Sequence, residues 1–329
     1  MVAKDWFTSS ALILLGMMLS LGCTGNVERD GSSHGMKTVS DNVKAVSDSP
    51  KAIEEKTVQS SVDLRGPHKP KGVRIRETLS VTMGECVLKS RMMDREITGK
   101  ILLRGESLEE TEIVESGPNG PTFVKIRHLR DTTEITTSLM GQTDTEKEQG
   151  TLVDQPIIGK RVDGKWSFSL ENKTASTEQS QALRQKAEGY GEDRDFYPEG
   201  KTAIGTSWKT PEGFFGRIMG TDVEVLSVSG QSTLTDVTER KGRRQALISV
   251  SLKVKGIEKE SRLSVAISLE GQYYRDLTDY LDVDGELKGT VQYSGSQSQD
   301  GIKVQLEMQG PLLTSYSQSI VKADNAQSK

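Results

Sequence analysis

Apolar and polar residues alternate most regularly in the last third of the chain. Residues 246–254 carry an apolar side chain at every second position, and residues 263–269 repeat the alternation. A period of two is typical of a strand that buries one face. Asp284-Gly285 and Asp300-Gly301 each separate two further alternating runs, and Asp-Gly is favoured in tight hairpin turns. Strands joined so tightly must be antiparallel, so this region predicts an antiparallel sheet.

The first half of the chain shows the same pattern in shorter pieces. From Val73 to Met83, apolar and polar residues fall on opposite parities, and only Glu77 breaks the order. Further strands are expected at Lys100–Arg104, Glu110–Glu115, Thr122–Arg130 and Thr132–Leu139. Gly-Pro-Asn-Gly at 117–120 and Asp163-Gly164 are turn signals. The sequence therefore predicts a second β-rich half.

One short helix is expected between the two halves. Ser176 to Gln179 fits a capping box, in which the serine side chain and the glutamine side chain each bond to the other's backbone amide. The run to Glu188 consists of good helix formers, and Gly189 would end it. Because it has few apolar side chains, we expect a connector that packs on a sheet.

An aromatic-rich, glycine-rich segment follows the helix. Its members are the candidate ligand-binding residues: Tyr190, Phe196, Tyr197, Trp208, Phe214 and Phe215. Aromatic side chains next to glycines can line an apolar or sugar-stacking groove. The alternative is that these rings form the seam between the two β halves.

These patterns predict a mainly β fold with antiparallel sheets in two halves, behind a disordered N-terminal tether. Residues 23–71 contain no Phe, Tyr or Trp and are rich in Ser, Lys, Asp and Glu. Such a composition cannot bury enough surface to offset chain entropy. The expected parts are a signal peptide at 1–22, the tether at 23–71, β-rich halves at 72–175 and 196–322, a connector at 176–195 and a frayed tail at 323–329.

The first residues have the form of a secretory signal. Lys4 precedes an uncharged run from Trp6, and Gly22 stands directly before Cys23. A basic start, an apolar middle and a small residue at the cut define such signals. Two alternatives stay open, a signal peptide cut elsewhere and an uncleaved span, although the apolar run is shorter than the roughly 20 residues that a bilayer core requires.

Ser20-Leu21-Gly22-Cys23 resembles the lipobox of bacterial lipoproteins, whose pattern is Leu, a small residue, Gly or Ala, then Cys. Ser20 and Leu21 depart from the usual residues. The resemblance implies cleavage before Cys23, acylation of its sulfur and its new amine, and a lipid anchor in a membrane of the bacterial cell envelope. The body would then lie in the periplasm or outside the cell. The predicted body is also remotely similar to lipoprotein carriers whose curved sheet cradles acyl chains, and that likeness transfers no site residue.

Charge and cysteine content narrow the function classes. The net charge is −4 at pH 7, and Lys4 and Asp5 cancel, so removal of the signal leaves it unchanged. A mildly acidic chain has no electrostatic footprint for nucleic acid. If Cys23 is acylated, Cys86 stands alone and no intrachain disulfide can form. We interpret Cys86 as a small buried hydrophobe.

The chain contains no strong catalytic pattern. His34 and His68 fall in the expected tether, and His128 shares a strand parity with apolar neighbours. Zinc motifs, the nucleophile elbow and phosphate-binding glycine loops are absent. We therefore predict no catalytic residue, no metal and no cofactor.

The leading hypothesis is a non-enzymatic envelope lipoprotein, either a scaffold or a module that binds a small apolar or sugar ligand. Two alternatives stay open. Carboxylates at Glu192–Asp195 or Asp276–Glu286 would suit a hydrolase of wall sugars or lipids if two of them faced each other across a cleft. A partner-binding subunit of an envelope complex would instead expose an apolar patch on its sheet.

The predicted lipid anchor can be tested by removing the sulfur atom of Cys23. In a bacterial host supplied with radiolabelled fatty acid, we expect the wild-type chain to be labelled and Cys23→Ser to be unlabelled, because the sulfur is the attachment point. Gel autoradiography measures the label, and Cys86→Ser serves as the matched control that should keep it. Equal labelling of Cys23→Ser and wild type would contradict the anchor.

Overall fold

The computed structural model describes residues 61–92, 95–211, 213–215, 223–259, 261–299 and 302–321. The expected signal peptide, Cys23, most of the tether and the tail at 323–329 lie outside these residues, and so does the predicted turn at Asp300-Gly301.

The structure is mainly β with a large antiparallel sheet and few helices, which confirms the predicted fold class. The strands of the large sheet are β2 (Arg74–Met92), β3 (Arg95–Gly117), β4 (Gly120–Leu139), β5 (Gln142–Gln149), β6 (Pro156–Val162), β7 (Lys165–Leu170), β9 (Ser207–Lys209), β10 (Val223–Arg240), β11 (Arg243–Glu258), β12 (Ser264–Asp276), β13 (Asp282–Gln299) and β14 (Ile302–Ile320). The other elements with bounds among the described residues are β1 (Ser61–Asp63), β8 (Lys201–Ala203), the helix α2 (Thr177–Gly189) and the 3-10 helix η1 (Asp193–Phe196).

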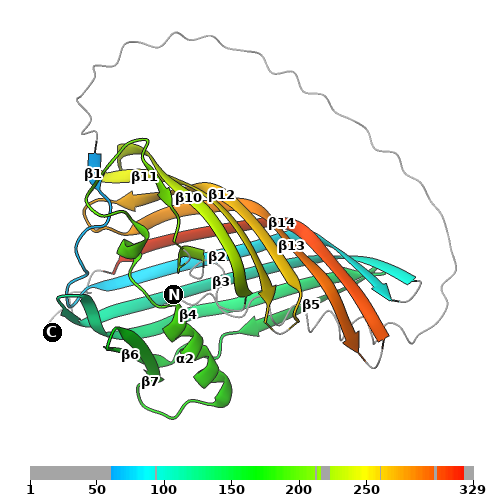
Figure 1. The fold of residues 1–329 in the computed structure, drawn as a ribbon. Helices are drawn as coiled ribbons and strands as arrows, with labels where there is room; N and C mark the ends of the chain where they lie inside the picture. Colours follow the sequence, from blue (N-terminus) through cyan, green and yellow to red (C-terminus); the bar gives the residue numbers. More distant parts are fainter. Residues whose placement is uncertain are drawn as a thin grey trace, which may run out of the picture.

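Both β-rich halves belong to one continuous sheet. The strand order is β7-β6-β4-β3-β2-β14-β13-β12-β11-β10-β9, with β5 paired to β4, and every neighbouring pair is antiparallel. The halves meet where β2 pairs with β14, from Ile75 opposite Ile320 to Met92 opposite Val304. The long strands curve together (Figure 1). Strands β1 and β8 form a separate small sheet.

Several strands are longer than the sequence predicts. Lys100–Arg104 and Glu110–Glu115 both lie in the 23-residue β3, and the next two predicted strands are both parts of β4. A bulge explains the apparent break, because Leu108 pairs with Arg130 whereas Glu109 pairs with His128. The extra residue reverses the side-chain parity without ending the strand.

One predicted turn is displaced. Asp284-Gly285 lies within β13, where the two residues pair with Tyr274 and Tyr273. The chain turns earlier, between Asp276 and Leu281. There the Asp276 carboxylate accepts hydrogen bonds from the backbone amides of Thr278 and Asp279, both at 2.8 Å, and Tyr280 adopts a φ of 51°. A side-chain cap therefore makes this turn, in place of the Asp-Gly dipeptide.

The alternation places apolar side chains on the inner face of the curved sheet. The buried strand residues of this main cluster are Leu79, Val81, Met83, Cys86, Leu88, Ile101, Leu103, Ile135, Leu139, Val223, Leu234, Val237, Ala246, Ile248, Val250, Leu252, Val254, Val265, Ile267, Leu269, Tyr273, Leu287, Val291, Tyr293, Val304, Leu306, Met308 and Leu312. Burial raises the pKa of the Cys86 thiol to about 11, which keeps it protonated. Cys86 is thus a buried hydrophobe, as predicted.

Helix α2 covers a different part of the sheet. Its Leu183 belongs to a second cluster with Ile157 and Leu170, at the β6–β7 end. The predicted capping box is present, with the Gln179 amide 3.2 Å from Ser176 Oγ and the Ser176 amide 3.1 Å from Gln179 Oε1. Within the described ranges, no helix combines the length and the apolar composition needed to cross a bilayer.

The stretch 61–71 differs from the expected tether, because it is built into the folded body. Val62 is 5% exposed and Leu64 is fully buried. Residues Ser61–Asp63 pair with β8. The composition of 23–71 as a whole conceals these two apolar residues, since most of their neighbours are polar. The ordered body therefore begins no later than Ser61.

Close backbone approach at Gly289 yields a stability prediction. A Cβ atom at this position would lie against the Ser268 carbonyl oxygen, nearer than real Cβ atoms come to any atom. We expect Gly289→Ala to lower the free energy of unfolding by about 1–3 kcal/mol, because β12 and β13 must move apart. Urea unfolding measures the change. Gly191→Ala is the control, since nothing lies within 4 Å of its added Cβ; equal stability of the two variants would contradict the close approach.

Candidate functional site

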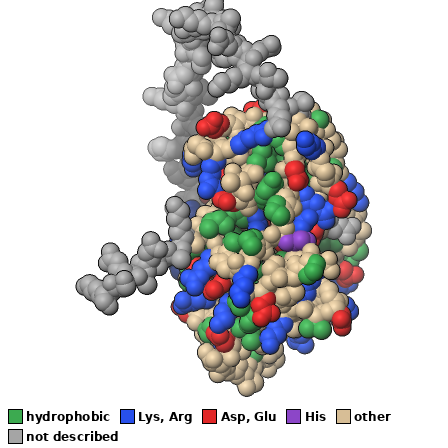
Figure 2. Space-filling model, turned by 90° about the vertical axis from the view of Figure 1, so that its left-hand side faces the viewer, with side chains coloured by type: hydrophobic (Ala, Val, Ile, Leu, Met, Phe, Trp, Pro, Cys, Tyr) green, Lys and Arg blue, Asp and Glu red, His purple; other side chains and the backbone are tan. Residues whose placement is uncertain are grey.

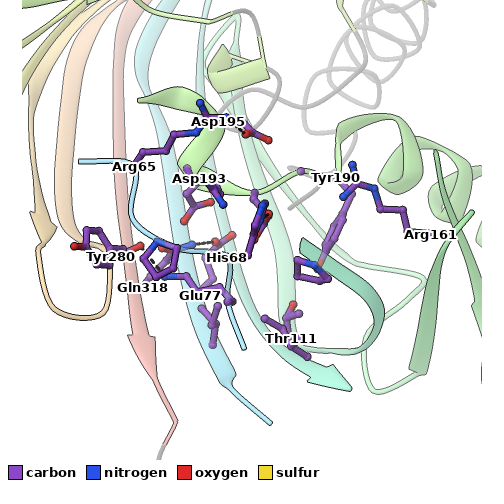
Figure 3. Close-up of a pocket in the computed structure, with 18 of the residues that line it drawn as sticks. Arg65, His68, Glu77, Thr111, Arg161, Tyr190, Asp193, Asp195, Tyr280 and Gln318 are labelled. Carbon is purple, nitrogen blue, oxygen red and sulfur yellow. Dashed lines mark hydrogen bonds and ion pairs between the residues drawn. The ribbon is translucent and has the colours of Figure 1, made fainter. Parts of the chain in front are cut away.

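A pocket of about 420 Å³ lies at one end of the inner face. Its floor is formed by inner-face residues of β2, β3 and β14, namely Glu77, Thr111 and Gln318. Its walls come from the segment 65–69, from Trp166 on β7 and from the loop 190–195 (Figure 3). Elements far apart in the sequence therefore meet at this end of the sheet.

The inner face changes from apolar to polar where the pocket begins. Along β2, Glu77 lines the pocket and the next inner-face residue, Leu79, belongs to the main hydrophobic cluster. Along β14, Leu312 is in the cluster, whereas Gln318 lines the pocket. On β2 and β14 the inner face therefore has a long apolar part and, at the pocket, a polar residue, while Ile75 and Ile113 add apolar groups to the pocket lining.

The pocket combines an aromatic wall with charges of both signs. The rings of Trp166 and Tyr190 meet edge to face, with centroids 4.8 Å apart. The cationic side chains are Arg65, Lys69, Arg161, Arg194 and Arg275, and the carboxylates are Glu77, Glu109, Glu192, Asp193 and Asp195. This end of the molecule shows acidic and basic side chains with hydrophobic ones between them (Figure 2). Such a lining suits a polar group attached to an apolar one.

Residues 64–69 form a strap that is held down by polar contacts. Arg65 pairs with Asp195 at 3.3 Å and also with Glu199. His68 Nδ1 contacts the Glu192 carboxylate, and Lys69 Nζ donates to the Tyr280 carbonyl oxygen at 2.8 Å. Burial lowers the pKa of Lys69. The strap and the loop 190–195 are therefore fixed to each other across the pocket mouth (Figure 3).

A buried ion pair fastens α2 to the pocket floor. Lys186 is fully buried and Glu109 is 5% exposed, with Nζ 2.7 Å from Oε2. His128 Nε2 lies 3.4 Å from the same carboxylate oxygen. Burial by itself would raise the pKa of Glu109, but the electrostatic effects of Lys186 and then His128 outweigh it and hold that pKa well below its usual range. Glu109 is therefore a carboxylate, and its charge is neutralised within the protein.

A second buried pair fixes the strap from beneath. Arg275 Nη1 lies 2.8 Å from Asp282 Oδ1, and the two side chains are 1% and 3% exposed. Arg275 Nε donates to the Leu64 carbonyl oxygen at 2.5 Å. Its guanidinium carbon sits 3.8 Å from the ring centroid of Tyr197, whose hydroxyl donates to Asp282. One arginine therefore joins β12, β13, the strap and the aromatic segment.

The structure separates the six candidate aromatic residues into two groups. Tyr190 lines the pocket. The other five, Phe196, Tyr197, Trp208, Phe214 and Phe215, are members of the main hydrophobic cluster or pack against it. The Phe214 ring lies 5.6 Å from Phe196 and 6.0 Å from Tyr273, measured between centroids. This placement favours the seam interpretation for the five, and a binding role for Tyr190 stays a prediction.

The two acidic groups have different surroundings. Residues Glu192–Asp195 lie at the pocket, as their side chains line it. The carboxylates in Asp276–Glu286 pair with basic side chains: Arg243 with Asp276 and Asp279, Arg275 with Asp282, Arg240 with Asp284, and Lys288 with Glu286. Among the described residues, no three side chains of the His, Cys, Asp and Glu types gather as a metal site would require.

Comparisons with known proteins give only distant similarities. No protein-family model matches the chain, and no curated protein matches it. The solved structure "Lipid-protein interactions in lipovitellin" is similar at a TM-score of 0.40 and 9% identity, over 80% of this chain and 26% of that one. A DUF1329 family protein from Desulfovibrio piger shows a TM-score of 0.11 and 11% identity, over 77% of this chain and 87% of its own. The chain thus spans about a quarter of the lipovitellin chain, and neither similarity transfers a functional residue.

The buried Glu109–Lys186 pair predicts a large effect of single substitution. We expect Glu109→Leu to lower the free energy of unfolding by about 3–5 kcal/mol, because Lys186 would remain buried without its carboxylate. Adding Lys186→Met should restore much of that loss. Chemical denaturation measures both variants. Lys147→Ala, which breaks the exposed pair with Glu134, is the control and should cost under about 1 kcal/mol. An equally small loss in Glu109→Leu would refute a buried, coupled pair.

Proposed function

We propose that this protein is a non-enzymatic lipoprotein of the bacterial cell envelope whose body binds an amphipathic lipid. Cys23, in its lipobox-like context, is the proposed anchor. The apolar chain of the ligand would lie on the inner face of the sheet. Its polar end would occupy the pocket lined by Arg65, Lys69, Glu192 and Tyr190.

The lengthwise division of the inner face is the observation that carries this proposal. A ligand with an apolar chain and a polar end requires two surfaces that adjoin, and Glu77 and Leu79 supply them on consecutive inner positions of β2. Each methylene group that the ligand buries stabilises the complex by about 0.8 kcal/mol. The polar end of the ligand would lose its contacts with water and gain contacts with the charged and aromatic side chains of the pocket.

The cover of the apolar face sets a condition that the proposal must meet. A sheet normally buries its apolar face against a second layer. Here the described residues that join the main cluster from outside the large sheet's strands come from 62–64, from 196–215 and from the turn residues Leu263 and Leu277, whereas α2 packs with the second cluster. The rest of the face is also buried, with Leu252 at 0% and Met308 at 7% exposure, so an apolar chain could reach it only if the covering side chains moved.

Access to the face requires side chains to move. Next to the pocket, a cavity of about 30 Å³ lies between Leu79, Phe214, Leu287 and Tyr316. That volume is close to the space of one water molecule. If an apolar chain entered at this point, it would have to displace an aromatic ring, and the rings that line this cavity include Phe214 and Tyr316.

The carboxylates of the pocket support a binding role over hydrolysis. A general acid needs a carboxyl group whose pKa is raised toward the working pH. Glu109 has a lowered pKa, Glu192 contacts His68 and Asp195 pairs with Arg65. The lowered pKa of Glu109 is the opposite of what a general acid requires, and the non-enzymatic character of the protein is part of the proposal.

Binding can be tested with a dansyl-labelled fatty acid. We expect saturable binding by the wild-type protein, measured by fluorescence titration, and at least about tenfold weaker binding by Thr137→Asp. Thr137 is 3% exposed on the inner face among Ile135 and Leu139, so the new carboxylate would meet the apolar chain. Thr136→Asp is the matched control, because its side chain points to the opposite face of the same strand.

A second measurement keeps the proposal open to refutation if Thr137→Asp does not fold. A photoreactive fatty acid bound to the wild-type protein should label inner-face residues such as Leu252 and Met308. Mass spectrometry of the peptides locates the label. Labelling of outer-face residues such as Lys253, or the absence of saturable binding, would overturn the proposal.

A further inference from the structure

A groove separates β7 from α2 at the edge of the sheet. In the sheet that the described residues form, β7 is the terminal strand and pairs only with β6. Helix α2 packs alongside it. The space between the two measures about 510 Å³ and is lined by Trp166 to Leu170 and by one face of the helix. This groove shares Trp166 with the pocket proposed for the polar end of the lipid, and its other lining residues lie outside that pocket.

The outer edge of β7 presents backbone hydrogen-bonding groups. Val162 and Lys165 close the two-residue hairpin at Asp163-Gly164. In an antiparallel pair, hydrogen-bonded and non-bonded residue pairs alternate from the closing pair onward. Trp166, Phe168 and Leu170 therefore direct their amides and carbonyl groups away from β6. They form the row of donors and acceptors that an added strand would use.

The facing side of α2 leaves room for such a strand. Ser180, Leu183, Arg184 and Ala187 line the groove and follow one stripe of the helix, at spacings of three and four residues. Ser180 and Ala187 are small. Leu183 and the half-buried Phe168 supply an apolar floor. An extended chain would thus find backbone partners on one side and space for alternate side chains on the other.

The charge of the groove selects the kind of chain. Its lining contains Lys173 and Arg184, both exposed, and contains no aspartate or glutamate. The protein as a whole carries a net charge of −4, so a cation-lined groove departs from the average surface. The two cations would repel basic side chains of an incoming chain and attract its carboxylates.

We propose that this groove binds an extended acidic peptide segment of a partner protein, which adds to the outer edge of β7 as a new antiparallel or parallel strand. Backbone bonds to Trp166, Phe168 and Leu170 would supply affinity. Apolar side chains of the peptide would pack on Leu183, and its carboxylates would meet Lys173 and Arg184. This is the recognition mode of strand addition to an exposed sheet edge.

The test uses the full chain in detergent and a display library of random linear peptides. We expect the selected peptides to be acidic with apolar residues at alternate positions. In the complex with such a peptide, hydrogen exchange at the amides of Trp166, Phe168 and Leu170 should slow relative to the free protein. Selection without acidic bias, or unchanged exchange at these amides, would overturn the proposal.

Charge reversal provides the matched variants. Lys173→Glu combined with Arg184→Glu should weaken the selected peptide by about tenfold or more, and Ala187→Trp should block it by filling the groove. Lys253→Glu, an exposed change on the outer face of β11, should leave binding unaltered. If the β7 amides are already protected in the free protein, a segment of the chain itself fills the groove and the partner proposal fails.

Discussion

The antiparallel pairing of β2 with β14 is the contact on which the rest of the structure depends. It joins the first long strand of the body to the last, so that two β-rich halves become one sheet. The same pairing places Glu77 beside Gln318, whose amide nitrogen lies 2.8 Å from the carboxylate. Without it, the pocket floor would be divided between two separate sheets, and the inner face would have no continuous length.

Buried charge complements this backbone pairing at the polar end. Arg275 and Asp282 fix the strap and the aromatic segment to the second half of the sheet. Glu109 and Lys186 fix α2 to the first half. Breaking either pair would strand a charge away from water, which costs more than the intact pair contributes. The two pairs thus specify where the short segments dock on an otherwise apolar face.

Local sequence patterns were sufficient for the fold class and for some of its details. The alternation in 246–254 identifies β11, the Asp163-Gly164 turn forms with φ values of 50° and 79°, and the Ser176 capping box is present. Each of these depends on near neighbours in the chain. The prediction of a turn at Asp284-Gly285 was wrong, because the chain reverses earlier, where the Asp276 carboxylate caps the backbone amides of the turn.

The pocket could not be predicted in the same way. Arg65, His68 and Lys69 lie in a polar stretch whose average composition is that of a tether, and only Val62 and Leu64 signal that it is ordered. Lys186 lies three residues after Leu183 and four after Ala182, on the apolar face of the helix, and it is fully buried there because Glu109, distant in sequence, lies opposite. Pairing between charges that are far apart in the chain produces no periodic pattern in the sequence, so it could not be predicted from that pattern.

The strap also determines how the body responds to force. Any pull transmitted from the residues before Ser61 reaches β1 first and then the contacts of Arg65 and Lys69 at the pocket mouth. The long strands of the sheet lie beyond these contacts and are shielded from that load. Force applied from the amino-terminal side would therefore break the strap contacts at the pocket mouth before it separated the long strands of the sheet.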